Sequence, residues 1–457
     1  MSRQMRLNAF LHPTGHHVAA WRHPDAQADA GANFEHYKRI ARTAERGKFD
    51  AVFVADFAGS ISSHELDAAS RMAFDLSFEP LTLIAALAAV TERIGLIATV
   101  TTTFNEPFNL ARKFASIDLI SGGRSGWNLV TSVNASEAFN FGLDQHVLHA
   151  DRYERAREFL QVVFGLWDSW EDTSFPRDKE SGLFFDPATL HILNHKGKHF
   201  SVRGPLNVPR SPQGRPVLVQ AGSSEPGRDL AGESAEVVFT AHQTLESAQE
   251  FYADVKSRAE AYGRDPDHVK ILPGVFPVVG ATRQEAENKY EQIQVLTHPV
   301  VGLDLLSGLV GGDVRKYPID GPLPDLPETN GNKSRQRLLF EMARRENLSI
   351  RDLYLRVAGA RGHWTIVGTP AYVADRLEEW FVGHGADGFN VMPPILPTGL
   401  DDFVDQVIPE LQRRGLFRRE YEGKTLRENL GLPKPSHRFA KPAAEIPHAI
   451  PETQYAK

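Results

Sequence analysis

The chain has 457 residues, of which 41% are hydrophobic and 24% charged, with a formal net charge of -7 and a mean hydropathy of -0.33. These values indicate a water-soluble globular protein with a large core, and the acidic balance argues against a nucleic-acid partner. Because the chain has no cysteine, disulfides, thiolate catalysis and cysteine-ligated metals are excluded, and chemistry has to come from oxygen, nitrogen or a cofactor.

Short apolar runs alternate with amphipathic stretches along the chain, a rhythm typical of βα units. Eight runs are expected to be strands: 7–11, 51–55, 94–99, 125–130, 216–220, 237–240, 272–279 and 388–391. Helices are expected at 33–46, 80–91, 110–121, 151–170, 245–262, 283–296, 370–382 and 401–414. This order predicts one α/β domain over residues 1–417, a (β/α)8 TIM barrel with insertions at its C-terminal face.

Three stretches do not fit a minimal barrel. Residues 171–215 and 298–332 are rich in proline and glycine and have little periodicity, so we expect them to be insertions, the second of them a lid. Helical patterns follow over 336–357. Residues 418–457 form a C-terminal extension, which from 420 onward is polar, rich in proline and without a core face.

No targeting or membrane segment is evident in the sequence. The first residues lack the apolar core of a signal peptide, and no run reaches the roughly eighteen apolar residues that are needed to cross a bilayer. We therefore expect a cytoplasmic protein with no membrane partner.

Polar residues stand where successive barrel strands end. Asp56 follows the second strand, Thr102 the third, Asn128 and Ser132 belong to the fourth, and a serine pair follows the fifth. Barrel active sites collect at this end of the strands. The alternative is that these polar residues only begin the loops after the strands. Their recurrence at four neighbouring strand ends favours a functional site instead.

The serine pair Ser223 and Ser224 is the best candidate for an anion site, because it places hydroxyls and free backbone N–H groups at a strand-to-helix turn. The alternative is a helix N-cap without a ligand. His149 and Tyr153, four residues apart, would share a helix face and reach the same anion. Ordinary packing of Tyr153 and a solvated arginine face at Arg152 are the alternatives there.

Other motifs are absent or uninformative. His16 and His17 are adjacent and would point to opposite faces of an extended chain, so no metal site is expected, although His17 is credible near a substrate pocket. The chain has no dinucleotide-binding GxGxxG, no P-loop and no nucleophile elbow.

Several long segments in the same order carry a family resemblance. They are LNAFLHPTGHHVAAWRHP, AERGKFDAVFVAD, EPLTLIAALAAVTERIGL, GRSGWNLVTS, HADRYERA and VLVQAGSS. Over residues 6–414 the chain resembles the flavin-dependent monooxygenases of the bacterial luciferase superfamily. Within it the chain is most similar to the nitrilotriacetate monooxygenase large-component family, which includes the dibenzothiophene-sulfone and EDTA monooxygenases.

The resemblance implies roles for the residues singled out above. Asp56 and Thr102 would contact the flavin ring or its near side chain, and two pairs would hold the phosphate end: His149 with Tyr153, and Ser223 with Ser224. Asn128 and Ser132 would lie along the ring, and His17 would face its reacting edge, so that His17 and Asn128 are the catalytic candidates.

The resemblance also implies an activity and its partners. FMN would be reduced to FMNH2 by a separate NAD(P)H:flavin reductase, and O2 would react through a peroxyflavin to oxygenate a small organic substrate, in some members with C–N or C–S cleavage. A homodimer or homotetramer is implied. Alternatives are a deazaflavin (F420)-dependent oxidoreductase of the same superfamily, a non-redox barrel enzyme acting on a phosphorylated substrate, and, last, a purely binding protein.

The substrate is open at this point. A polyanion would need several convergent cations. The lid contains Arg315, Lys316 and Tyr317, but no motif that names a ligand. An aromatic sulfone would need an apolar cavity, lined by residues such as Phe10, Phe57 and Phe104.

Overall fold

The computed structural model describes residues 3–56, 58–59, 66–74, 76–132, 134–329 and 333–439. Eight parallel strands close into a barrel in the order β1-β2-β3-β4-β7-β8-β9-β11, and β11 pairs with β1 again. Their bounds are β1 (Arg6–Leu11), β2 (Ala51–Val54), β3 (Gly95–Thr101), β4 (Ser125–Val130), β7 (Val217–Ala221), β8 (Val237–Thr240), β9 (Lys270–Val279) and β11 (Gly388–Val391). The predicted TIM barrel is confirmed.

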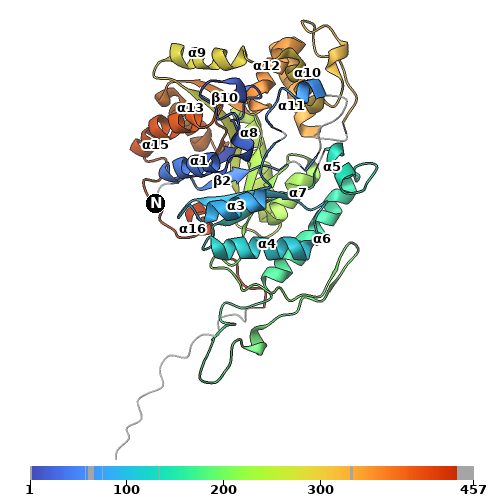
Figure 1. The fold of residues 1–457 in the computed structure, drawn as a ribbon, viewed down its shortest axis with the longest axis vertical. Coiled ribbons are helices and arrows are strands. Elements are labelled where there is room, and N and C mark those ends of the chain that lie inside the picture. The colour runs from blue at the N-terminus through green and yellow to red at the C-terminus, as the bar shows by residue number, and fades with distance from the viewer. Residues whose placement is uncertain are drawn as a thin grey trace, which may run out of the picture.

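Helices cover the outside of the barrel (Figure 1). They are α1 (Phe34–Arg46), α2 (Leu66–Ala69), α3 (Pro80–Ala88), α4 (Pro107–Ile120), α5 (Ala135–Asn140), α6 (His149–Trp167), α7 (Glu225–Ser234), α8 (Leu245–Ala261), α9 (Arg283–Gln294), α10 (Pro299–Val310), α11 (Lys333–Glu346), α12 (Ile350–Ala360), α13 (Pro370–Val382), α14 (Thr398–Asp402), α15 (Ile408–Arg413) and α16 (Leu426–Leu430). A π-helical turn, Phe403–Val407, joins α14 to α15 in the predicted 401–414 helix.

One strand escaped prediction. β10 (Trp364–Gly368) lies outside the closed ring and pairs with the second half of the long strand β9. The sequence WTIVG is short and follows directly on the turn at Gly362, so it did not stand out from the helical pattern before it.

The two excursions differ in character. Residues 171–215 extend away from the barrel (green in Figure 1) and contain only the two-residue strands β5 (His195–Lys196) and β6 (Ser201–Val202) and one 3-10 turn. The expectation of loose structure over 298–332 is wrong at its start, where α10 forms a regular helix that packs with α11 and α12. Pro299 at the first turn of α10 is compatible with a helix, which explains the misreading.

The C-terminal segment also departs from expectation. Residues 420–439 were expected to lack a core face, yet Leu426, Leu430 and Leu432 are buried in the cluster that fills the barrel interior. Two ion pairs tie this segment to the barrel strands and their loops, Arg418 with Asp50 and Arg427 with Glu236. The helix α16 is one and a half turns long, too short to give a visible period in the sequence.

Burial accounts for the strand pattern. Along β1 the odd-numbered residues Leu7, Ala9 and Leu11 pack against the helices, while Phe10 packs inside the barrel. Arg124 secures the start of β4: its guanidinium is buried and donates five hydrogen bonds to oxygens of the α3–β3 and α4–β4 turns. Arg124 therefore fixes the start of β4 against the turns that precede β3 and β4, and the opposite ends of these two strands carry the candidate site.

In the described part of the chain no single helix is long and apolar enough to cross a bilayer, and the consecutive pair α9 and α10, which passes that test together, is bent by 91°.

Candidate functional site

A cavity of about 1290 Å³ opens at the C-terminal ends of the strands. Its walls come from the ends of β2, β4, β7 and β8, the first turns of α6 and α7, and α11. Residues of the 298–332 segment, Asp325, Leu326 and Glu328, add to the lining. The cavity brings together these predicted site residues: Asp56, Ser132, His149, Tyr153, Ser223 and Ser224.

One pole of the cavity lies at the N-terminus of α7. Ser224 is the N-cap of α7, and its Oγ accepts from the N–H of Gly227 at 3.3 Å. Tyr153 Oη lies 3.4 Å from the same Oγ, and a Cβ on Gly227 would come within 3.0 Å of that phenol oxygen. Glycine therefore leaves the backbone open to a ligand at a helix N-terminus, where the dipole and free N–H groups favour negative charge.

His149 stands beside this pole in neutral form. Its ring centroid is 4.9 Å from that of Tyr153. Burial, together with the charges of Arg152 and Lys333, lowers the pKa of His149, so the ring offers a neutral hydrogen-bond donor and acceptor rather than a charge.

Arg152 is a residue that sequence reasoning missed. It was weighed as part of a solvated face, but only 1% of it is exposed. Its Nη1 donates to the carbonyl of Ser132, while Nε and Nη2 are buried and have no hydrogen-bond partner among the described residues. Ser132 itself has φ of 53°, and its Oγ donates to Thr101 Oγ1 at 2.9 Å. A buried guanidinium with unused donors beside the cavity suits a ligand rich in acceptors.

The amide of Asn128 lies just beneath the cavity. Its Nδ2 donates to Thr99 Oγ1 at 2.9 Å, and its Oδ1 is buried with no hydrogen-bond partner in the described part of the chain. Thr99 lines the cavity, whereas Thr102 is fully buried and donates from Oγ1 to the carbonyl of Val130. Side chains alternate along a strand, so Thr99 and Thr101 face the interior together.

The two adjacent histidines have separate surroundings. His17 is fully buried outside the cavity lining: its Nδ1 accepts from the N–H of Ala19, and its Nε2 donates to Gln294 Oε1 at 3.0 Å. Burial lowers the pKa of His17 to about 4. His16 instead packs against Phe10: its Nε2 lies 2.9 Å from the Phe10 carbonyl oxygen, and the two rings meet edge-on.

A hydrogen-bonded relay runs along the wall from the serine pair. Ser223 Oγ lies 3.2 Å from Thr240 Oγ1, which is 3.0 Å from His242 Nε2. Burial lowers the pKa of His242 to about 4, with the charge of Arg335 adding to the effect. The neighbouring ring of His363 stacks on Phe239 with centroids 4.9 Å apart.

The apolar residues considered for an aromatic substrate do not converge in the described structure. Phe10 packs inside the barrel against Phe53 and Phe239, whereas Phe104 stacks on Phe141. Phe57 lies outside the described residues. Of the lid residues singled out, Arg315 pairs with Asp313, and Lys316 is 74% exposed.

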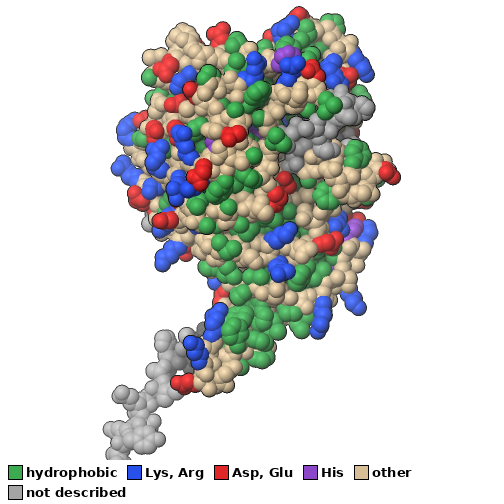
Figure 2. Space-filling model, viewed as in Figure 1, with side chains coloured by type: hydrophobic (Ala, Val, Ile, Leu, Met, Phe, Trp, Pro, Cys, Tyr) green, Lys and Arg blue, Asp and Glu red, His purple; other side chains and the backbone are tan. Residues whose placement is uncertain are grey.

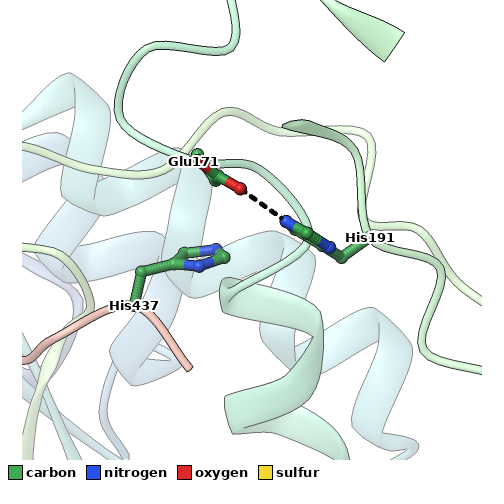
Figure 3. A group of neighbouring side chains, drawn as sticks. All are labelled: Glu171, His191 and His437. Atoms are coloured by element: carbon green, nitrogen blue, oxygen red, sulfur yellow. Dashed lines mark hydrogen bonds and ion pairs between the residues drawn. The ribbon is translucent and has the colours of Figure 1, made fainter. Parts of the chain in front are cut away.

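Glu171, His191 and His437 bring potential metal-ligand atoms within 4.8 Å of one another, away from the cavity (Figure 3). His191 and Glu171 are 2.9 Å apart. Both ring nitrogens of His437 already have backbone partners, since Nε2 donates to the carbonyl of Asp168 and Nδ1 accepts from the N–H of Phe439. The group is thus arranged as a tie between the C-terminal segment and the 171–191 stretch.

Comparison with known proteins gives consistent matches. Residues 14–388 match the family described as luciferase-like monooxygenase. The chain is 54% identical to N-acetyl-S-(2-succino)cysteine monooxygenase of Bacillus subtilis, over 96% of this chain and 99% of that protein. It is 52% identical to nitrilotriacetate monooxygenase component A of Aminobacter aminovorans, over 97% and 99%. A crystal structure of a riboflavin lyase with modified FMN and riboflavin superposes with a TM-score of 0.85 at 33% identity, covering 94% of this chain and 96% of that one.

Proposed function

Since the chain belongs to the luciferase-like monooxygenase family, we propose that it is the oxygenase of a two-component system, which takes FMNH2 from a separate reductase and uses O2 to oxygenate a small organic substrate. The observation that carries the flavin assignment is the anion pole of the cavity, with its N-capping serine, its glycine backbone and its phenol. The chain is a monooxygenase by its family; the identity of the reduced flavin and the reductase partner are the proposed parts.

The residues present fit a flavin mononucleotide. Ser223, Ser224 and Tyr153 would bind the phosphate at the α7 N-terminus, and the neutral ring of His149 would add a hydrogen bond. Arg152, Ser132 and Asp56 line or border the part of the cavity that leads toward the barrel axis, where the ring of the flavin would lie. The orphaned oxygen of Asn128 beneath it would gain a partner from the ring.

Reduced flavin would supply the electrons that activate O2; the protein contributes binding, orientation and exclusion of water. Residues 298–332 remain the proposed lid: Asp325, Leu326 and Glu328 line the cavity beside α11, and α10 packs with α11 and α12. A dry cavity protects the reactive state from decay to hydrogen peroxide. His17 and Asn128 remain the catalytic proposals made from the sequence.

We also infer a homo-oligomer. The projecting 171–215 segment carries the exposed apolar side chains Leu183, Phe184 and Ile192, at 44%, 62% and 42% exposure. Figure 2 shows hydrophobic side chains gathered over the lower projection of the molecule, where this segment extends. Exposed apolar patches of this kind mark contact surfaces.

The test is an anaerobic titration of the purified chain with FMNH2, followed by rapid mixing with oxygenated buffer while the flavin spectrum is recorded. Tight binding of FMNH2 and a transient absorbance unlike that of either free oxidised or free reduced flavin are expected. Failure to bind FMNH2, with binding of reduced deazaflavin instead, would refute the proposal.

A further inference from the structure

His242 connects two hydroxyl groups on the wall of the cavity. Its Nε2 lies 3.0 Å from Thr240 Oγ1, and its Nδ1 lies 2.9 Å from Ser247 Oγ. Thr240 Oγ1 lies in turn 3.2 Å from Ser223 Oγ, next to the N-terminus of α7. All four side chains line the cavity, and Thr240 and His242 are only 4% and 7% exposed. Together the four residues form a relay of hydrogen bonds that ends at Ser223.

The ring of His242 is neutral at neutral pH, which leaves it a single N–H. Burial, with the charge of Arg335 adding to the effect, lowers the pKa of His242 to about 4. One nitrogen of a neutral imidazole donates and the other accepts, whereas a hydroxyl can turn either way but has only one hydrogen. Both hydrogen-bond partners of the Thr240 hydroxyl among the described residues belong to the relay, so its buried hydrogen has to be used there. The relay can therefore run in two directions.

The tautomer of His242 decides what Ser223 can offer to a ligand. If Nδ1 carries the hydrogen, Nε2 accepts from Thr240, Thr240 accepts from Ser223, and the hydroxyl hydrogen of Ser223 is used on the cavity wall. If Nε2 carries the hydrogen, His242 donates to Thr240, and Thr240 donates to Ser223. The Ser223 hydrogen can then point into the cavity. Only this second state allows Ser223 to donate to an anion.

We propose that His242 is a positioning residue for the flavin phosphate: as the Nε2–H tautomer it orients the Thr240 and Ser223 hydroxyls so that Ser223 donates to the phosphate. The inference rests on the proposed function, which places the phosphate at the α7 N-terminus, and it adds a residue that acts through Ser223. A phosphate ester is an anion with acceptor oxygens, so its binding selects this tautomer. The relay thereby contributes to the choice of a phosphorylated flavin over riboflavin.

Plain packing is the alternative role of the His242 ring, whose centroid is 5.1 Å from that of Phe251. If packing were its only role, the direction of the hydrogen bond to Thr240 would not matter. Glutamine and glutamate have the same shape and separate the two roles. The amide of glutamine can donate to Thr240 as Nε2–H does, whereas an ionised carboxylate only accepts and turns the relay in the opposite direction.

The experiment measures the dissociation constants of FMN and of riboflavin for the full chain at about pH 8, where a free glutamate is ionised. We expect the parent chain to prefer FMN, and His242→Gln to bind FMN within about threefold of the parent. His242→Glu should weaken FMN by about tenfold to a hundredfold, the range for a hydrogen bond lost to a charged group. Riboflavin affinity should change by less than about twofold in both variants.

His268→Gln is the matched control, because His268 lies outside the cavity lining and its side chain is 39% exposed. It should change neither affinity. Circular dichroism and riboflavin affinity verify the folding of each variant.

Repulsion between a carboxylate at position 242 and the phosphate is separated from the relay by Ser223→Ala. Without the Ser223 hydroxyl the relay has nothing to orient. In the Ser223→Ala background the FMN affinities of His242→Gln and His242→Glu should therefore agree within about threefold, because the coupling passes through Ser223. Repulsion through space would leave the full difference in place.

A second readout uses the chain without substitution. The ¹⁵N resonances of the His242 ring, identified by their loss in His242→Gln, show which nitrogen carries the hydrogen. With FMN bound, the hydrogen should be on Nε2. This measurement does not depend on the folding of the glutamate variant.

Equal FMN affinity of His242→Gln and His242→Glu, a difference between them that persists in Ser223→Ala, or an Nδ1–H ring in the FMN complex would overturn the proposal. Equal affinity of the parent chain for FMN and riboflavin would overturn it together with the placement of the phosphate at α7. A relay effect on FMN affinity without any reaction of bound FMNH2 with O2 would instead support this inference while refuting the proposed function.

Discussion

Ser224→Asp separates the two tasks of the residue that caps α7. Aspartate is as good an N-cap as serine, so the hydrogen bond to the N–H of Gly227 is kept and the free energy of unfolding should change by less than about 0.5 kcal/mol. A phosphate at the same helix terminus would lose the serine hydroxyl as a donor and meet a carboxylate instead.

The magnitude follows from charge and distance. A lost hydrogen bond to a charged group is worth about 1.5 to 3 kcal/mol. Repulsion between unit charges about 5 Å apart adds about 3 kcal/mol at an effective dielectric constant of about 20. The dissociation constant for FMN should therefore rise by at least about a hundredfold, since 1.4 kcal/mol corresponds to a factor of ten.

The assay is fluorescence quenching of FMN on titration with protein, beside thermal unfolding of the same samples. The double variant Ser223→Ala with Ser224→Ala should weaken FMN by about 1 to 3 kcal/mol and also lower stability, because it removes the cap. If Ser224→Asp bound FMN within threefold of the parent chain, the placement of the phosphate at this helix would be wrong.

Three further outcomes are expected. Leu426→Ala should lower the free energy of unfolding by about 2 to 5 kcal/mol in urea titrations, without changing FMN affinity, because Leu426 is fully buried; Leu119→Ala, at a 38% exposed position, is the control and should change it by less than about 0.5 kcal/mol. Arg124→Ala should cost at least about 3 kcal/mol, since it strands several buried oxygens; a smaller loss would show that water replaces the guanidinium. In the folded chain the pKa of His17 is lowered to about 4, whereas in the unfolded chain it is about 6.5, so only the unfolded chain binds this proton as the pH falls from 7.5 to 5. The free energy of unfolding should therefore drop by about 2 kcal/mol over this range because of His17. In His17→Asn this part of the stability–pH profile should be flatter, and an unchanged profile would contradict the assignment.

Periodicity predicted the barrel ring, and the strand ends pointed to residues that the fold does bring around one cavity, the serine pair among them. The eight ring strands are apolar runs of four to ten residues, and a strand buried on both faces shows in the sequence as such a run. Ser224 could be placed at a helix start because N-cap preference is local. Structural features that depend only on neighbouring residues in the sequence could therefore be predicted.

Features that depend on distant partners could not be predicted from the sequence. Arg335 and Arg361 are separated by 26 residues, and only the packing of α11 beside the end of α12 brings them together. Arg152 was indistinguishable in sequence from an exposed helical arginine, because its burial depends on the loop after β4. Thr102 was singled out by its place after the predicted third strand, whereas β3 runs on to Thr101 and Thr99 within it lines the cavity.

The C-terminal helix α16 has a consequence for the order of events during synthesis. Every barrel strand leaves the ribosome before residues 417–432, which seal the base of the barrel through Leu426, Leu430 and Leu432. Until they arrive, the nascent chain presents an apolar opening lined by residues such as Val217 and Val237, and its last packing step spans nearly the whole sequence. Such distant contacts form slowly. Newly made chains would thus remain clients for chaperones until translation is nearly over, and an early stop codon after the last strand would give an unsealed barrel rather than a slightly shorter enzyme.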